Sequence, residues 1–325
     1  MFARPKFLVL YERGNNMKTL LIRKKQKGKL QKESLGERIF DFFNVVFLIA
    51  ISIIAVYPLW HVFCASFSDA TAIMGKSGAI LYPFSGDGSL AMNIDAYKKA
   101  FSHPLILTSY WNSILITGVA TTINIILTAL CAYVLSRKGM MLKKFFTVVI
   151  TLTMFFGSEM IPRYIVYTKI LNLYDSMWVL ILPGAINVYN MIVMRTNFES
   201  IPESLFESAR IDGAGHIKTL YRIVLPLSKP IIAVMVLYYA VAHWNDWFDA
   251  SIFLQDRNKF PLQLVLREIL IQNDTASMNG ASDVEGLSET IKYATMIIAT
   301  VPILCVYPYL QKYFTKGVMV GAVKG

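Results

Sequence analysis

Apolar residues follow one another in long runs along this chain, and short polar segments separate the runs. A helix needs about 20 mostly apolar residues to cross the roughly 30 Å of hydrocarbon in a bilayer. Six runs reach or approach that length, so the pattern predicts an all-α membrane protein with six transmembrane helices. The predicted spans are Ile39–Trp60, Ser113–Leu135, Phe145–Val166, Met177–Met194, Pro230–Leu254 and Ile291–Tyr309; the fourth is short, and polar residues interrupt the fifth.

The composition agrees with a membrane protein. Of 325 residues, 55% are hydrophobic and 16% are charged, whereas soluble domains carry about 25% charged residues. The net charge is +11, but the basic residues cluster between the apolar runs and form no basic-aromatic face of the kind that binds nucleic acid. The three cysteines, Cys64, Cys131 and Cys305, form no CxxC pair and are interpreted as small buried hydrophobic residues.

The distribution of Lys and Arg predicts the orientation of the spans. Basic residues are concentrated before span 1, between spans 2 and 3, and after span 6, and such flanks stay in the cytoplasm. Both termini are therefore expected inside, in the plasma membrane of a bacterium. We expect a basic cytoplasmic segment 1–38, a permease domain 39–310 and a cytoplasmic tail 311–325, with Met1 and Met17 both open as the start. Segments 61–112, 167–176 and 255–290 are expected outside, and 195–229 inside.

The segment from Ser200 to Pro230 reads SIPESLFESARIDGAGHIKTLYRIVLPLSKP. Ser200 and Glu203 have the spacing of a capping box, which predicts a helix start. Gly213 can adopt the left-handed conformation that ends a helix, and a second short helix is expected to stop at Pro226. This pattern predicts two short helices with a glycine corner, although composition alone also fits an ordinary loop lying on lipid headgroups.

The spacing within this segment carries a family resemblance. Glu207-Ser208-Ala209, three residues, Gly213, nine residues and Ile223-Val224-Leu225-Pro226 resemble the EAA loop of binding-protein-dependent ABC importers, whose pattern is E-A-A-x3-G-x9-I-x-L-P. Ser208 is the one departure. The stretches Asn197–Pro202, His243-Trp244-Asn245 and Tyr313–Gly325 look like the maltose-type permeases for sugars and oligosaccharides. Gly36–Ser68 and the tail look most like a Gram-positive subgroup linked to polysaccharides, and the resemblance covers roughly residues 36–325.

The resemblance implies a type I ABC importer permease fold and a set of partners. These are a second homologous permease, two ATPase subunits that bind ATP and Mg, and an extracellular solute-binding lipoprotein. The loop 200–226 would couple transport to the ATPase, with Leu205, Phe206 and Ala209 as apolar anchors and Glu207 paired with a basic group. This chain would bind no cofactor and have no catalytic residue. The full set of expected coupling residues is Leu205, Phe206, Glu207, Ala209, Asp212, Gly213, Ile223, Leu225 and Pro226.

Polar residues within the spans are candidates for the translocation path. In span 3, Glu159 and Arg163 are four residues apart and can pair on one helical face. In span 5, Trp244, Asn245, Asp246 and Asp249 combine aromatic rings, which stack on sugars, with amide and carboxylate groups that bind hydroxyls. A structural ion pair in span 3 and an aromatic belt in span 5 are the alternatives left open.

Other functions fit the residues less well. Ala70–Ser77 ends in GKS but lacks the first glycine of a phosphate-binding loop, and no HExxH motif or ligand cluster predicts a metal site. A secondary transporter would leave the EAA spacing unexplained, and a membrane enzyme should have a nucleophile and base. Within the ABC class, a permease for peptides or amino acids remains an alternative.

Overall fold

The computed structural model describes residues 35–69, 73, 78–102, 104–156, 160–278 and 282–322, and the regular elements among them are helices. The chain divides into two units, residues 1–55 and 56–325. Helix α1, Leu35–Ser66, contains the first predicted span, and its most apolar 18 residues have a mean hydropathy of 2.5 with no buried side chain. Such a surface is suited to lipid. Most of the expected segment 1–38 lies outside the described residues, as do Glu159 and all of Ala70–Ser77 except Ile73.

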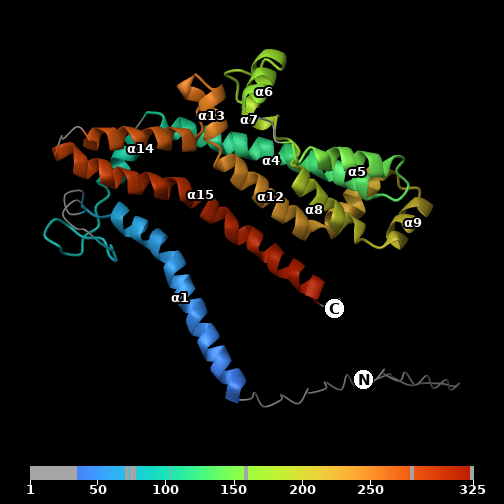
Figure 1. Ribbon diagram of the computed structural model, residues 1–325, viewed down its shortest axis with the longest axis horizontal. Helices are drawn as coiled ribbons and strands as arrows, with labels where there is room; N and C mark the ends of the chain where they lie inside the picture. Colours follow the sequence, from blue (N-terminus) through green and yellow to red (C-terminus); the bar gives the residue numbers. More distant parts are fainter. Residues whose placement is uncertain are drawn as a thin grey trace, which may run out of the picture. The chain divides into compact units, whose positions relative to one another are not determined.

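Helix α4, Ile106–Ser136, contains the second predicted span and is the centre of the second unit (Figure 1). It packs against α8, Val188–Glu199, and α12, Lys229–Trp244. Small residues cover the contact faces of membrane helices because they allow close backbone approach. Many of the buried side chains of α4 are small, and these include Ser109, Ser113, Ala120, Thr121, Thr128, Ala129 and Ala132.

The last helix, α15 (Ser282–Ala322), contains the sixth predicted span and continues through most of the predicted tail. It lies beside α14 (Leu262–Met278), α12 and α3 (Asp95–Ser102), as Figure 1 shows for α14. The sequence pattern predicts that the segment 255–290 faces outward and assigns it no helix. In the structure this segment contains the 3-10 turn η3 (Arg257–Lys259) and the 17 residues of α14.

Spans 3, 4 and 5 are each interrupted. Span 3 becomes α5, α6 and the π-helix η1; span 4 becomes α7 and α8; span 5 becomes α12 and α13. Pro183 and Gly184 lie in the break between α7 and α8. The helix is interrupted there because proline and glycine both disfavour a helix interior. The additional bounds are α5 Lys143–Leu152, α6 Met160–Ile165, η1 Val166–Ile170, α7 Trp178–Ile181 and α13 Phe248–Phe253.

Three helices in the described part of the chain are long and apolar enough to cross a membrane: α1, α4 and the Thr290–Tyr309 part of α15. The helices His216–Leu227 and Lys229–Trp244 meet at 86°, and together they would form a fourth span, bent at Ser228. The helical class predicted from the sequence is therefore confirmed, whereas the number of six spans remains a prediction.

Candidate functional site

The predicted coupling loop begins differently from the sequence-based expectation. Helix α9 (Glu203–Ile211) starts after Pro202, which makes no side-chain cap. Ser200 ends α8, and its hydroxyl donates a hydrogen bond to the Asn197 carbonyl at 2.7 Å. The predicted capping box between Ser200 and Glu203 is therefore wrong, because the Ser200 hydroxyl is already used by the preceding helix.

Gly213 ends α9 in the predicted left-handed conformation, with φ of +69°. The Ala214 N–H donates to the Ala209 carbonyl at 2.8 Å, and the Gly213 N–H donates to the Arg210 carbonyl at 3.0 Å. This pair of bonds is the Schellman arrangement, which satisfies the last carbonyls of a helix. The glycine corner predicted from the sequence is confirmed.

The second half of the loop is a continuous helical stretch of α10 (His216–Thr219), the π-helix η2 (Leu220–Val224) and α11 (Leu225–Leu227). The expectation that Pro226 stops it is wrong. Pro226 lies just after the π-helix η2, and the helical stretch continues past it to Leu227. The turn occurs at Ser228, whose N–H still bonds the Val224 carbonyl at 3.0 Å before the 86° change of direction into α12.

Burial changes the role that we assign to two of the expected apolar anchors. Phe206 is 3% exposed and Ala209 is 5% exposed. Phe206 belongs to the core formed with Tyr133 of α4 and Phe198 of α8, and the Arg137 guanidinium lies 3.6 Å from its ring centroid. Both side chains therefore attach the loop to its own chain and are not available to a partner.

A different set of apolar side chains is exposed on this loop. Leu205 is 39% exposed, Tyr221 73%, Ile217 79% and Ile211 87%. The other residues expected to take part in coupling also differ in exposure. Glu207, Asp212, Gly213 and Pro226 are exposed, and Ile223 and Leu225 are half-buried.

Ion pairs also fasten the loop to the adjoining helices. Glu199, at the end of α8, accepts hydrogen bonds from Lys143 at 2.9 Å and from Arg195 at 3.1 Å. Burial acts to raise the pKa of Glu199, but the bonds from Lys143 and Arg195 outweigh it, so the pKa is lowered. Lys138 lies 4.0 Å from Glu203 of α9. These contacts tie the α4–α5 connection to the start of the loop.

The candidate path residues fall into separate groups. Arg163 pairs with Asp249 at 2.7 Å, and Asp246 accepts the Asp249 N–H at 3.2 Å, so these three lie together. Trp244 is 5% exposed, and its indole N–H donates to the Ala299 carbonyl at 3.0 Å, so it packs inside the chain. Asn245 is exposed and bonds the Val241 carbonyl of its own helix. The partner of Arg163 in the described structure is thus Asp249, while the expected partner Glu159 lies outside the described residues.

A buried polar network between α4 and α12 was missed in the sequence. The Tyr239 hydroxyl contacts the Thr128 hydroxyl at 2.7 Å and accepts the Asn187 N–H at 3.0 Å. Asn124 lies 3.3 Å from the His243 ring and donates to the Gly184 carbonyl at 3.2 Å. Asn124 and Thr128, like Tyr239 and His243, are four residues apart, and this matched spacing of polar residues on two spans was the available signal.

Asp175 joins two segments that are expected on the outer side. Its carboxylate accepts the N–H groups of Gln255 and Asp256, each at 3.0 Å, and the Lys259 ammonium at 2.8 Å. The backbone bond from Asp256 and the bond from Lys259 lower the pKa of Asp175 to about 2. Both oxygens of the Asp175 carboxylate accept hydrogen bonds from residues 255–259, so Asp175 holds the two segments together as a structural clamp.

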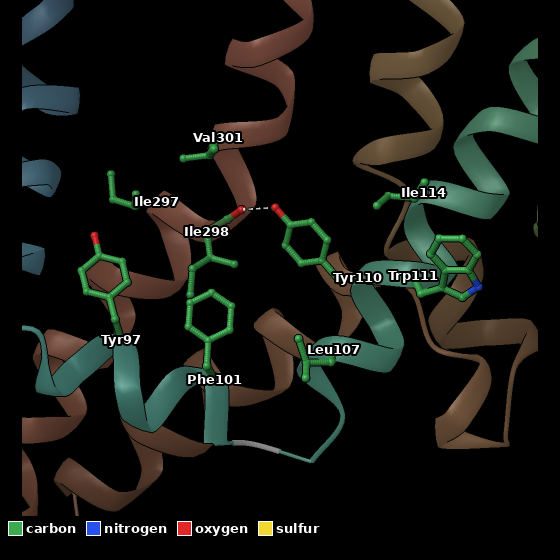
Figure 2. Close-up of a pocket in the computed structure, with 9 residues that line it drawn as sticks. All are labelled: Tyr97, Phe101, Leu107, Tyr110, Trp111, Ile114, Ile297, Ile298 and Val301. Atoms are coloured by element: carbon green, nitrogen blue, oxygen red, sulfur yellow. Dashed lines mark hydrogen bonds between the residues drawn. The ribbon is translucent and has the colours of Figure 1, made fainter.

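An apolar cavity of about 530 Å³ lies between α3, α4 and α15. Figure 2 shows the side chains that line it. The Tyr110 hydroxyl, one of its few polar groups, donates to the Ile298 carbonyl at 3.2 Å. Such a lining is poorly suited to sugar hydroxyls. Across the described ranges, no group of three or more His, Cys, Asp or Glu could hold a metal ion.

Comparison with known proteins decides the family. Residues 124–320 match the family described as the binding-protein-dependent transport system inner membrane component. The chain belongs to this family. It is therefore a membrane permease component of an ABC importer and not an enzyme, as the EAA-like spacing predicted.

Relatives match over nearly the whole chain. Protein LplC of Bacillus subtilis (strain 168) is 40% identical, with 89% of this chain and 96% of LplC covered. The polygalacturonan/rhamnogalacturonan transport system permease protein YtcP of the same organism is also 40% identical, with 90% and 100% covered. A solved bacterial ABC transporter involved in the import of the acidic polysaccharide alginate is similar with a TM-score of 0.76 and 31% identity, covering 87% of this chain and 99% of that one.

Proposed function

We propose that this permease and a second homologous subunit enclose the translocation path for an oligosaccharide or polysaccharide. An extracellular solute-binding lipoprotein would deliver the solute, and two ATPase subunits would bind ATP and Mg on the cytoplasmic side. The names of YtcP and of the alginate transporter support the saccharide class. In this proposal the chain crosses the membrane six times, has both termini inside and binds no cofactor itself.

The exposed apolar surface of the loop carries the proposal. Leu205, Ile211, Ile217 and Tyr221 project from short helices that Phe206, Leu220 and Val224 attach to the core. Burying one large apolar side chain contributes roughly 1.5–3 kcal/mol. A surface of this kind, next to the exposed Glu207, is suited to the cleft of an ATPase subunit. Leu205 and Glu207 keep the roles expected for them, and Ile211, Ile217 and Tyr221 replace Phe206 and Ala209.

The attachment of the loop explains how ATPase movement would reach the path. Phe206 packs on the end of α4 and on α8, and the helix from His216 leads through Ser228 into α12. A displacement of the loop is therefore transmitted to α12, the helix that bears Tyr239 and His243. Rigid-body movement at a packed interface is an established form of switching.

The polar cluster of Arg163, Asp246 and Asp249 is proposed to border the path. Trp244 supports it from within the chain, because its indole is committed to Ala299. Of the four candidate residues in span 5, Asn245 is the exposed one. Carboxylate, amide and guanidinium groups are the hydrogen-bonding partners that sugar hydroxyls need.

The docking surface can be tested with matched substitutions. Ile217→Asp and Ile211→Asp should remove co-purifying ATPase subunits and abolish solute-stimulated hydrolysis in reconstituted vesicles. Ile170→Asp is the control, because Ile170 is 70% exposed but is expected on the opposite side of the membrane. Normal ATPase retention by both loop variants would contradict the proposed coupling role.

The topology has an independent test. On a background without Cys64, Cys131 and Cys305, we expect an impermeant thiol reagent to label Asp87→Cys from outside intact cells. Ile217→Cys should react only after the membrane is opened. Labelling of position 217 in sealed cells would overturn the proposed orientation.

A further inference from the structure

Two adjoining cavities lie at the C-terminal end of α4, with volumes of about 490 and 270 Å³. They share Tyr133, Arg137, Arg210 and His216, so they form one site between α4 and the loop. The residues that line either cavity include two arginines and no Asp or Glu. The site is therefore electropositive where α9 meets α4.

Arg137 is held in a fixed position but is not fully satisfied. Its Nε and Nη2 atoms donate to the Ser136 hydroxyl at 3.2 and 3.1 Å, and its guanidinium stacks on Phe206. Nη1 is buried and has no hydrogen-bond acceptor in the described part of the chain. A buried charged donor without an acceptor is costly, so an oxygen atom added beside this guanidinium would stabilise the site.

Nearby carboxylates do not supply this acceptor. Glu199 is already bonded to Lys143 and Arg195, and Glu203 forms an ion pair with Lys138 at 4.0 Å. Arg210 is exposed on α9 and lines both cavities, so a ligand could contact it together with Arg137. Two guanidinium groups facing one cavity are suited to the oxygen atoms of a phosphate group.

The larger cavity adds an apolar lobe to the basic one. Leu130, Val134, Met140 and Ile217 line it beside Arg137. The second predicted span ends at Leu135, so Arg137 follows the hydrocarbon region by two residues. The cavity thus combines a charged end at headgroup level with an apolar end on the membrane side, and the cytoplasmic leaflet is rich in anionic lipid.

We infer that this site binds an anionic phospholipid, with the phosphate between Arg137 and Arg210 and the start of an acyl chain along Leu130 and Val134. The inference rests on the proposed topology, which puts this end of α4 in the cytoplasmic leaflet. A lipid bound there joins the end of α4 to the loop helix α9. It therefore stabilises the attachment of the loop, and Ile217 is the residue that this site shares with the proposed ATPase-facing surface.

Binding is measured by calorimetry on the purified full-length chain in detergent, with dioctanoyl phosphatidylglycerol as the probe and dioctanoyl phosphatidylcholine for comparison. We expect preferential binding of phosphatidylglycerol. Arg137→Gln and Arg210→Gln should each weaken it about tenfold, because each removes a charge-assisted bond. Arg222→Gln, an exposed arginine of the same loop that lines neither cavity, should change it by less than about twofold.

Arg210→Gln keeps the test valid if Arg137→Gln fails to fold, because Arg210 is exposed. Equal binding of both lipids, or unchanged binding by Arg210→Gln, would overturn the inference. Displacement of the lipid by an equal concentration of sn-glycerol phosphate would also overturn it, because the ligand would then be a soluble phosphate. The assay requires no transport, so its failure in a chain that imports normally leaves the proposed function standing.

Discussion

The Arg163 guanidinium donates two hydrogen bonds to the Asp249 carboxylate, at 2.7 and 3.3 Å, and joins α6 to α13. The two side chains remain 23% and 27% exposed. This contact connects the interrupted third span with the end of the fifth. A bidentate pair of arginine and carboxylate fixes orientation as well as distance, so it can hold these short helices in register.

Breaking this pair should impair both stability and uptake. Loss of one partner costs about 3–5 kcal/mol in a fully buried pair, and we expect less here because of the partial exposure. Arg163→Ala and Asp249→Ala should each reduce solute uptake by cells, and Arg163→Asp combined with Asp249→Arg should regain part of it. Lys98→Ala, which breaks the exposed pair with Asp95, is the control and should have no effect. A double variant no better than either single one would argue against the pairing.

The glycine corner predicts a contrast between two nearby positions. At Gly213, φ is +69°, and a β-branched residue there costs about 1–2 kcal/mol. A Cβ atom at this site would have no neighbour within 4 Å, so the strain lies in the backbone alone. Gly213→Val should lose co-purifying ATPase, whereas Gly213→Asn should retain most of it because asparagine tolerates this conformation.

Gly215 provides the control for that contrast, because its φ is −69° and its surroundings are equally open. Gly215→Val should therefore retain the ATPase. If Gly213→Val and Gly215→Val retain equal amounts of ATPase, the left-handed conformation of Gly213 is not required for ATPase binding.

The Asp175 clamp predicts a dependence of stability on pH. Its pKa is about 2 in the folded chain and ordinarily 3.8. A lowered pKa stabilises the folded state above the ordinary value, and this contribution disappears as the pH falls through the folded value. Thermal unfolding of the wild type and of Asp175→Asn in detergent should differ at pH 7, and the difference should shrink below pH 4 towards pH 2. A constant difference across that range would contradict the role of the carboxylate charge.

Sequence periodicity predicted the elements whose apolar runs were unbroken. Helices α1, α4 and α15 contain three of the predicted spans, because length and hydropathy alone determine them. Gly213 was also predictable, since few other residues favour its conformation. In α14, by contrast, Arg267 and Glu268 interrupt the apolar residues, so a search for long apolar runs does not find this helix. Its apolar residues nevertheless pack into the core.

Tertiary contacts determined what the sequence could not show. The apolar stripe of α9 predicts that one face of this helix is buried. Only the structure shows that the stripe packs partly against the same chain and not wholly against a partner. Phe206 is covered by Arg137, a residue 69 positions earlier in the sequence, and no local pattern reveals such a contact. In the same way, Arg163 forms an ion pair with Asp249 of another predicted span, whereas the four-residue spacing favours Glu159.

The Tyr239 hydroxyl offers the sharpest test of the buried polar network. Tyr239 is 4% exposed, and its hydroxyl accepts the backbone N–H of Asn187 and contacts Thr128. Tyr239→Phe keeps the ring but leaves the Asn187 N–H without its bond, which should cost about 1–3 kcal/mol. The neighbouring Tyr238 is 49% exposed, so Tyr238→Phe removes a hydroxyl from the same helix without this loss.

Unfolding of the purified chain by denaturant should therefore separate the two variants, with Tyr239→Phe less stable and Tyr238→Phe like the wild type. The Asn187 side chain also caps α8 by accepting the Asn190 N–H at 3.1 Å. Releasing its backbone from Tyr239 should loosen that helix start and raise amide hydrogen exchange at residues 188–191. Unchanged exchange there, together with unchanged stability, would mean that Tyr239 holds α4 and α12 together through its ring alone and that its hydroxyl does not anchor α8.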